Sequence, residues 1–276
     1  MKHLYFSLFA LLLFNISEIQ AQNNMIFGAR QVSMGGTGLI YSDIWSSSHN
    51  QAGLADIKGY GAGAYYSDRF QLSELGTAAF TLVAAAGKFG TFGLNYTQFG
   101  YELYSQNKFG LAYGKRLGKR VSAGIQLDYF TISQGGPYGK QGFATGEIGI
   151  QAEPIDNFYV ATHVFSPWPV KISSSEDLYV PTIFRLGTGY QFSDEVIVSL
   201  EVEKDIENSP IVRFGTEYEI FEQFFIRGGF SSTPAEFAFG IGYNFKNVQL
   251  DLAFKNHNTL GFSSHAGLSY LTGDDK

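Results

Sequence analysis

Apolar and polar residues alternate along most of the chain after about residue 59, and this period of two limits the fold more than any other feature. Val121, Ile125 and Leu127, for example, alternate with Gln126 and Asp128. Successive side chains of a β-strand point to opposite faces, so such a segment forms a strand with one apolar face and one polar or small face. The sequence therefore predicts an all-β protein.

The alternating segments number about 14, which suits a large sandwich or a barrel. Their expected first residues are Gly59, Thr77, Phe89, Lys108, Val121, Phe143, Phe158, Thr182, Val196, Ile211, Phe224, Phe237, Val248 and Leu260.

The connections distinguish these two folds. Every second connection is tight, namely 85–87, 116–119, 153–157, 193–194, 221–222 and 246–247. The intervening ones are longer and more polar, namely 67–76, 100–107, 133–142, 166–181, 204–210 and 231–235. Outer-membrane barrels have short periplasmic turns and longer extracellular loops, whereas a sandwich has no reason to sort its loops in this way. We therefore predict a closed antiparallel transmembrane β-barrel of about 14 strands.

In such a barrel the polar faces of the strands line the lumen. The predicted lumen charge network consists of Asp128, Glu147, Arg185, Glu201, Arg213, Glu217, Arg227 and Asp251. Because both signs are present, these side chains can pair across a narrow lumen, and the favoured interpretation is a neutralised interior that holds its shape. A charged, substrate-selective channel is the alternative.

The start of the chain has the layout of a secretory signal peptide. Lys2 precedes an apolar run over 4–14, and Ile19-Gln20-Ala21 forms a cleavage site. The run is too short for a membrane helix, and no Cys follows it that could carry a lipid anchor. We therefore expect export and insertion into the lipid of the cell outer membrane.

Composition agrees with a membrane barrel and argues against other classes of protein. The 33 Gly, 26 Phe and 17 Tyr fit many strands whose aromatic side chains face lipid or its interface. No Cys is present, so disulfides and thiolate metal sites are excluded. A net charge of −6 offers no basic face to nucleic acid. We expect neither a cofactor nor a nucleic-acid partner.

The segment 22–57 differs from the strands that follow and carries a family resemblance. Its matching residues are Ala29, Arg30, Met34, Gly35, Gly36, Gly38, Asp43, Asn50, Ala52, Gly53 and Leu54. With these residues the segment resembles the N-terminal region of FadL-type hydrophobic-compound channels and of the related PorV-like barrels of type IX secretion. Gln51 departs from the family pattern, in which a proline is usual. The resemblance implies that 22–57 forms a plug inside the barrel. With the signal peptide over 1–21, the expected organisation is a plug over 22–57 and a barrel over 58–276.

The plug residues have a physical role that suits a confined lumen. Gly35, Gly36 and Gly38 allow tight backbone turns, and Arg30 could reach the inward carboxylates. A phosphate-binding loop is excluded, since the Lys-Ser/Thr pair and the strand–loop–helix unit of such a loop are missing. The expected plug site is therefore structural; its residues are Arg30, Gly35, Gly36, Gly38, Asp43, Asn50 and Gly53.

Catalysis is weakly supported. Asp43, the serines at 46–48 and His49 lie close together in sequence, but a triad is a spatial arrangement and rarely forms within so short a segment. Ser264 and His265 are neighbours on one predicted strand, so their side chains point to opposite faces. We predict that the protein is not an enzyme.

Two functions remain for a non-enzymatic barrel. The first is an accessory or carrier subunit of an outer-membrane secretion or assembly machine, with other membrane or secretion proteins as partners. The second is a passive FadL-like channel for small hydrophobic compounds. Only the connection 166–181, with Trp168, offers exposed apolar residues, so the sequence favours the accessory subunit with Trp168 as its extracellular contact.

The signal peptide leads to the first testable prediction. Because Ala21 ends the cleavage motif, mass spectrometry of the protein from outer membranes should find Gln22 at its N-terminus. An intact Met1 in that fraction would contradict the prediction.

Overall fold

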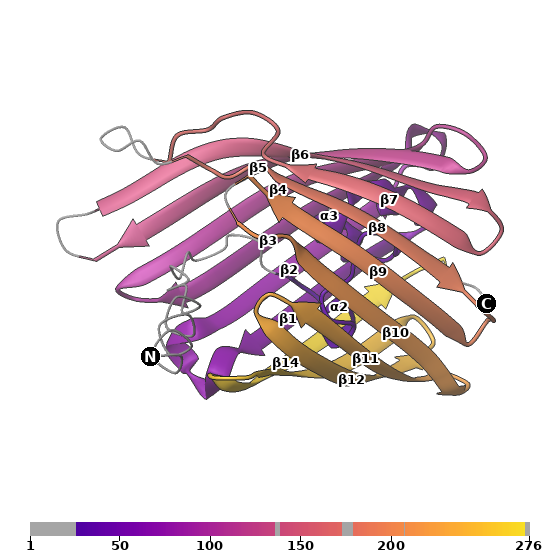
Figure 1. The fold of residues 1–276 in the computed structure, drawn as a ribbon. Coiled ribbons are helices and arrows are strands. Elements are labelled where there is room, and N and C mark those ends of the chain that lie inside the picture. Colours follow the sequence, from indigo (N-terminus) through magenta and orange to yellow (C-terminus); the bar gives the residue numbers. More distant parts are fainter. Residues whose placement is uncertain (1–25, 136–138, 173–178, 207, 274–276) are drawn as a thin grey trace, which may run out of the picture.

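The computed structural model describes residues 26–135, 139–172, 179–206 and 208–273. Within them fourteen antiparallel strands form a closed barrel in which each strand pairs with the next and the last pairs with the first (Figure 1). The predicted fold class is confirmed. The expected signal peptide over 1–21 lies outside the described residues.

The strands follow the alternating segments closely, and six of them begin at the predicted residue. Their bounds are β1 Tyr60–Asp68, β2 Gly76–Ala85, β3 Thr91–Tyr101, β4 Tyr104–Arg116, β5 Val121–Gln134, β6 Gly139–Ile155, β7 Phe158–Phe165, β8 Ile183–Gln191, β9 Val196–Asp205, β10 Ile211–Phe221, β11 Phe224–Ser232, β12 Ala235–Phe245, β13 Val248–His257 and β14 Gly261–Leu271.

The two ends of the barrel differ in their connections, although less than the sequence suggested. The end that carries 69–75 and 166–182 is called the loop end here, and the opposite end, with β10–β11 joined by 222–223, is called the turn end. The loops expected over 100–107 and 231–235 are wrong, since β3 and β4 pair as far as Tyr101 and Tyr104 and β11 and β12 as far as Ser232 and Ala235. Polar residues do not end a strand while a neighbouring strand still offers backbone partners.

The two faces of the wall have the expected polarity. On β13, Leu250 and Leu252 point outward and are half exposed, whereas Asp251 between them is buried in the lumen. Large apolar side chains therefore cover the outside, as lipid requires. None of the helices in the described part of the chain has the length and apolarity to cross a membrane.

The lumen is filled by the chain that precedes β1. Helices α2 (Ala29–Ser33) and α3 (Ser46–His49) and the 3-10 turn η1 (Gln51–Asp56) lie within the ring of strands (Figure 1). Three further 3-10 turns lie in connections: η2 (Arg69–Gln71), η3 (Ser73–Leu75) and η4 (Gly87–Phe89). Apolar plug side chains such as Phe27, Trp45 and Leu54 form one core cluster with wall residues that include Tyr65 and Val83. The residues 26–57 are called the plug from here on.

Inward-facing glycines allow the plug to pack directly on the wall. A Cβ at Gly229 would lie 2.0 Å from the Gly35 nitrogen, and one at Gly124 would lie 2.3 Å from the Gln51 carbonyl carbon. Ten strands carry such glycines: Gly61, Gly63, Gly93, Gly114, Gly124, Gly149, Gly187, Gly189, Gly215, Gly229, Gly240 and Gly267. The other four strands place Ala79, Ala161, Ser199 and Ala253 against the plug. These residues form a belt of small side chains around the lumen, which explains much of the glycine content.

The orientation of the wall can be tested by placing charge on its outer face. Leu252→Arg, near the middle of β13, should lower the free energy of unfolding in lipid by about 2–4 kcal/mol, because the guanidinium would enter the bilayer core. Phe245→Arg, at the end of β12, should cost about 0–1 kcal/mol, since the charge would reach the interface. Urea titration in lipid vesicles measures both values, and equal costs would contradict the assignment of depth.

Candidate functional site

Three clusters of charged side chains join the plug to the wall. Each cluster holds a different part of the plug, and together they contain all eight residues of the predicted lumen charge network.

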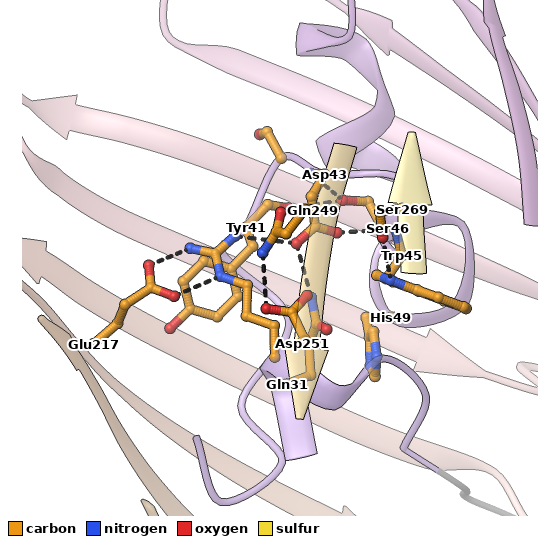
Figure 2. Close-up of polar contacts among 12 residues, drawn as sticks. Gln31, Tyr41, Asp43, Trp45, Ser46, His49, Glu217, Gln249, Asp251 and Ser269 are labelled. Carbon is orange, nitrogen blue, oxygen red and sulfur yellow. Dashed lines mark hydrogen bonds and ion pairs between the residues drawn. The ribbon is translucent and has the colours of Figure 1, made fainter. Parts of the chain in front are cut away.

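The first cluster holds α2. Arg30 donates two hydrogen bonds to Glu217 of β10, at 2.9 and 2.7 Å, and lies 3.2 Å from Asp43 of the plug (Figure 2). Arg227 of β11 also contacts Glu217 and donates to Asp251 of β13 at 2.6 Å. Two arginines and three carboxylates thus form one continuous network. The bidentate contact between Arg30 and Glu217 fixes the orientation of the guanidinium as well as its position.

The second cluster holds the turn that follows α2. The backbone N–H groups of Gly38 and Leu39 both donate to one oxygen of Glu201, at 2.5 and 2.6 Å. Arg185 donates to the other oxygen at 2.8 Å, and Arg213 donates to Glu203 at 2.8 Å. Glu201 is 1% exposed, so these donors replace the water that its charge would otherwise require.

The third cluster holds η1 on the opposite side of the lumen. Glu147 accepts from the Gln51 amide at 2.6 Å and from Lys108 at 2.5 Å, and it lies 3.0 Å from Nε2 of His163. Lys108 also lies 3.3 Å from Asp128. Gln51, which stands where the family pattern has a proline, therefore provides a direct hydrogen bond from the plug to the wall.

Two partners in these clusters were missed by the sequence analysis. Lys108 and Glu203 are inward-facing but were not included in the predicted network. Both lie within the predicted alternating segments, Lys108 as the first residue of one and Glu203 two residues after Glu201, so the alternation alone could have found them.

The glycines of the plug act in two ways. Gly35 and Gly36 have φ of 69° and 89°, a conformation that favours glycine, and they turn the chain after α2. Gly38 serves a close approach instead, since a Cβ there would lie 2.8 Å from the His49 ring. A Cβ at Gly53 would lie 2.4 Å from the Tyr41 carbonyl oxygen.

The polar plug residues bind the plug's own backbone and the wall. Asp43 accepts from the Gln31 amide at 2.8 Å and from the Trp45 backbone N–H at 2.9 Å (Figure 2). The Asn50 amide donates to the carbonyls of Leu39 and of Ile150 on β6, at 2.9 and 3.3 Å.

The serines, His49 and Asp43 of the plug do not form a triad. Nε2 of His49 lies 2.7 Å from the Phe27 carbonyl oxygen, while the Ser46 hydroxyl donates to the Tyr41 carbonyl. Burial lowers the pKa of His49 to about 3, so the ring is neutral and donates to Phe27. Over the described ranges no cluster of His, Asp and Glu has the geometry of a metal site.

Trp168 lies away from the lumen. Trp168 lies at the start of the long connection between β7 and β8 and is 45% exposed. Its ring packs against Gly146, an outward-facing residue of β6. The ring thus covers part of the outer wall near the loop end. Its expected role as a partner contact stays a prediction.

A cavity of about 360 Å³ opens at the loop end beside α2, and we call it the vestibule. The plug forms its floor through Ile26, Val32, Gly35 and Gly36, and strands β1, β2 and β10–β14 with their loops form its walls. At the turn end, two cavities of about 180 and 240 Å³ both touch Arg30. Helix α2 and the Arg30 cluster therefore separate the vestibule from the turn end.

No protein-family model matches this chain, and no curated protein matches it. Several solved structures have the same fold. The Pseudomonas putida toluene transporter TodX is 13% identical with a TM-score of 0.65, over 88% of this chain and 96% of that chain. The monoaromatic hydrocarbon channel CymD is 13% identical with a TM-score of 0.66, over 90% and 97%. A Pseudomonas aeruginosa FadL homologue is 13% identical with a TM-score of 0.61, over 90% and 98%.

These likenesses identify the fold as that of FadL-like outer-membrane barrels. At this level of identity they establish the architecture alone. The resemblance of the N-terminal segment to PorV-like barrels stays a prediction.

The Arg30 cluster yields a prediction about closure. Arg30→Met should leave Asp43 without its cation and Glu217 with Arg227 alone, which costs about 3–5 kcal/mol for a buried pair, and should loosen α2. We expect an ion conductance in planar bilayers that the unaltered protein lacks.

A matched control is Arg116→Met, which breaks the plug–wall ion pair with Asp56 at the turn end. This pair is exposed and contributes about 0–1 kcal/mol, so the variant should stay closed. Equal conductance in the two variants would show that the Arg30 cluster does not hold the plug.

Proposed function

We propose that this protein is a passive outer-membrane channel for small hydrophobic molecules, which enter at the vestibule and leave past α2. The observation that carries the proposal is the position of the vestibule. Its volume of about 360 Å³ falls in the range of small-molecule sites, and its floor is formed by the plug itself. A bound molecule therefore contacts the segment that must move for it to pass.

The wall of the vestibule combines apolar and polar groups. Ile26, Val32, Phe70, Ile211 and Leu260 provide apolar surface in this cavity beside its charged and hydroxyl groups. TodX and CymD, which share this fold, are described as a toluene transporter and a monoaromatic hydrocarbon channel. These descriptions belong to those proteins, and they support the same class of ligand for this one.

The sequence favoured an accessory subunit of a secretion machine. That role would draw on extended loops for contact with partners, and the connections 102–103 and 233–234 are tight turns. Trp168 also packs partly on the barrel's own wall. The channel is therefore the function that we prefer.

The proposal is tested by uptake through a lipopolysaccharide-containing outer membrane. Cells that express the protein should take up radiolabelled toluene several-fold faster than cells with the empty vector. Ser231→Trp, which fills the vestibule from β11, should return the rate to the empty-vector level. Ala62→Trp adds the same ring to the lipid-facing side of β1 and should keep the unaltered rate. Heat-modifiable gel mobility establishes that each variant is folded.

If cells with the folded protein in their outer membrane took up toluene no faster than cells with the empty vector, the result would contradict the channel. Recovery of a stoichiometric secretion or assembly protein with the folded barrel in mild detergent, together with that unchanged rate, would favour the accessory subunit.

A further inference from the structure

Three residues that line the vestibule have a buried polar side-chain atom without a hydrogen-bond partner among the described residues. The atoms are Nε2 of His265, Nε of Arg213 and Oγ1 of Thr77. Their residues are 6%, 4% and 2% exposed, so bulk water does not solvate them freely. Twelve buried side-chain polar atoms of the described residues lack a hydrogen-bond partner, and three of them belong to residues of this one cavity. Buried polar groups are nearly always paired in proteins, so a polar group of a ligand is the partner that this cavity can offer them.

The chemistry of these atoms defines what they bind. The Arg213 guanidinium stays protonated in a protein, so its Nε is a donor. The Tyr65 hydroxyl lies 2.7 Å from Nδ1 of His265, and when it donates there the neutral ring carries its hydrogen on Nε2. The Thr77 hydroxyl can also donate. All three groups can therefore act as hydrogen-bond donors, and a carboxylate with its several lone pairs is a suitable acceptor.

Charge around the vestibule favours an anion. Lys255 pairs with Glu236 at 2.9 Å, and Arg213 pairs with Glu203 at 2.8 Å. Arg69 makes no ion pair with any residue that the structure describes, and its guanidinium lies 5.9 Å from the centre of the Phe99 ring. The lining therefore keeps an excess of positive charge.

The lining of the vestibule also includes flat rings. The Tyr65 and His265 rings stack with centroids 6.0 Å apart, and Phe70 meets His257 edge to face at 5.9 Å. Flat rings line the same cavity as the unpaired donors. Such a wall accepts the faces and edges of another ring.

We propose that the vestibule binds a small aromatic carboxylate. Its carboxylate accepts from Nε of Arg213 and Nε2 of His265 near Arg69, and its ring packs beside Tyr65 and Phe70. This inference rests on the proposed channel only for the direction in which the ligand later moves. It differs from the proposed function in the ligand's class, because a hydrocarbon leaves all three donors unpaired.

Binding to the full chain in detergent tests the proposal. Isothermal titration at pH 7 compares benzoate with benzamide, which has the same ring without the charge, and with toluene, which lacks an acceptor. Benzoate should bind at least tenfold more tightly than toluene, with benzamide between them. Palmitate, as a long-chain acid, should not displace benzoate.

Two substitutions locate the site. Arg69→Gln removes a positive charge and keeps part of the alkyl stem, and His265→Phe removes a donor and keeps an aromatic ring. Each substitution should lower the ratio of benzoate to toluene affinity by about tenfold. Lys140→Gln removes an exposed charge at the tip of β6, away from the vestibule, and should leave the ratio unchanged.

Equal affinity for benzoate and toluene, displacement by palmitate, or a ratio that both substitutions leave unchanged would overturn the proposal. These outcomes are separate from the uptake test. Toluene uptake without selective benzoate binding removes this inference and keeps the channel. Selective benzoate binding without uptake keeps this site and removes the channel.

Discussion

Every backbone N–H and C=O in the lipid-exposed part of this chain needs a partner within the protein, because the bilayer core offers none. Fourteen strands meet this requirement by closing on themselves, with β1 paired to β14 along eight residue pairs. Closure fixes which residues face lipid and which face the lumen, since a shift of register by one residue would exchange the two faces. Leu252 and Asp251 have opposite environments for this reason.

A closed lumen then has to accommodate charge. Glu147, Glu201 and Glu217 are each nearly buried, and each would be costly without cations and N–H donors around it. The plug supplies part of these partners through Gln51, the Gly38–Leu39 turn and Arg30. The belt of small residues lets the plug approach closely enough to make these contacts. Wall and plug therefore form one interior, and the buried charges of each need partners from the other.

The vestibule adds an open space to this interior. Arg213, which belongs to the second charged cluster, and His265 line this cavity beside α2, and Nε of Arg213 and Nε2 of His265 have no partner among the described residues. Because Gly36 of the plug lines the vestibule and also lies against the Arg213 side chain, occupation of the cavity is coupled by direct contact to the plug. Ligand binding, the position of the plug and the sealing of the lumen are thus connected by the same contacts.

Local sequence was sufficient for the strands, because a period of two reflects the pleat of each strand and needs no tertiary information; Val121, Phe158 and Val248 begin strands as predicted. The same period identified inward residues such as Glu201 and Arg227. The sequence could not determine that β3 and β4 pair to a two-residue turn, since this depends on the neighbouring strand. Nor could it show that the backbone of Gly35 packs directly on Gly229, or that Arg213, Thr77 and His265 line one cavity. Strands far apart in the chain become neighbours only when the barrel closes, and closure therefore decided the site.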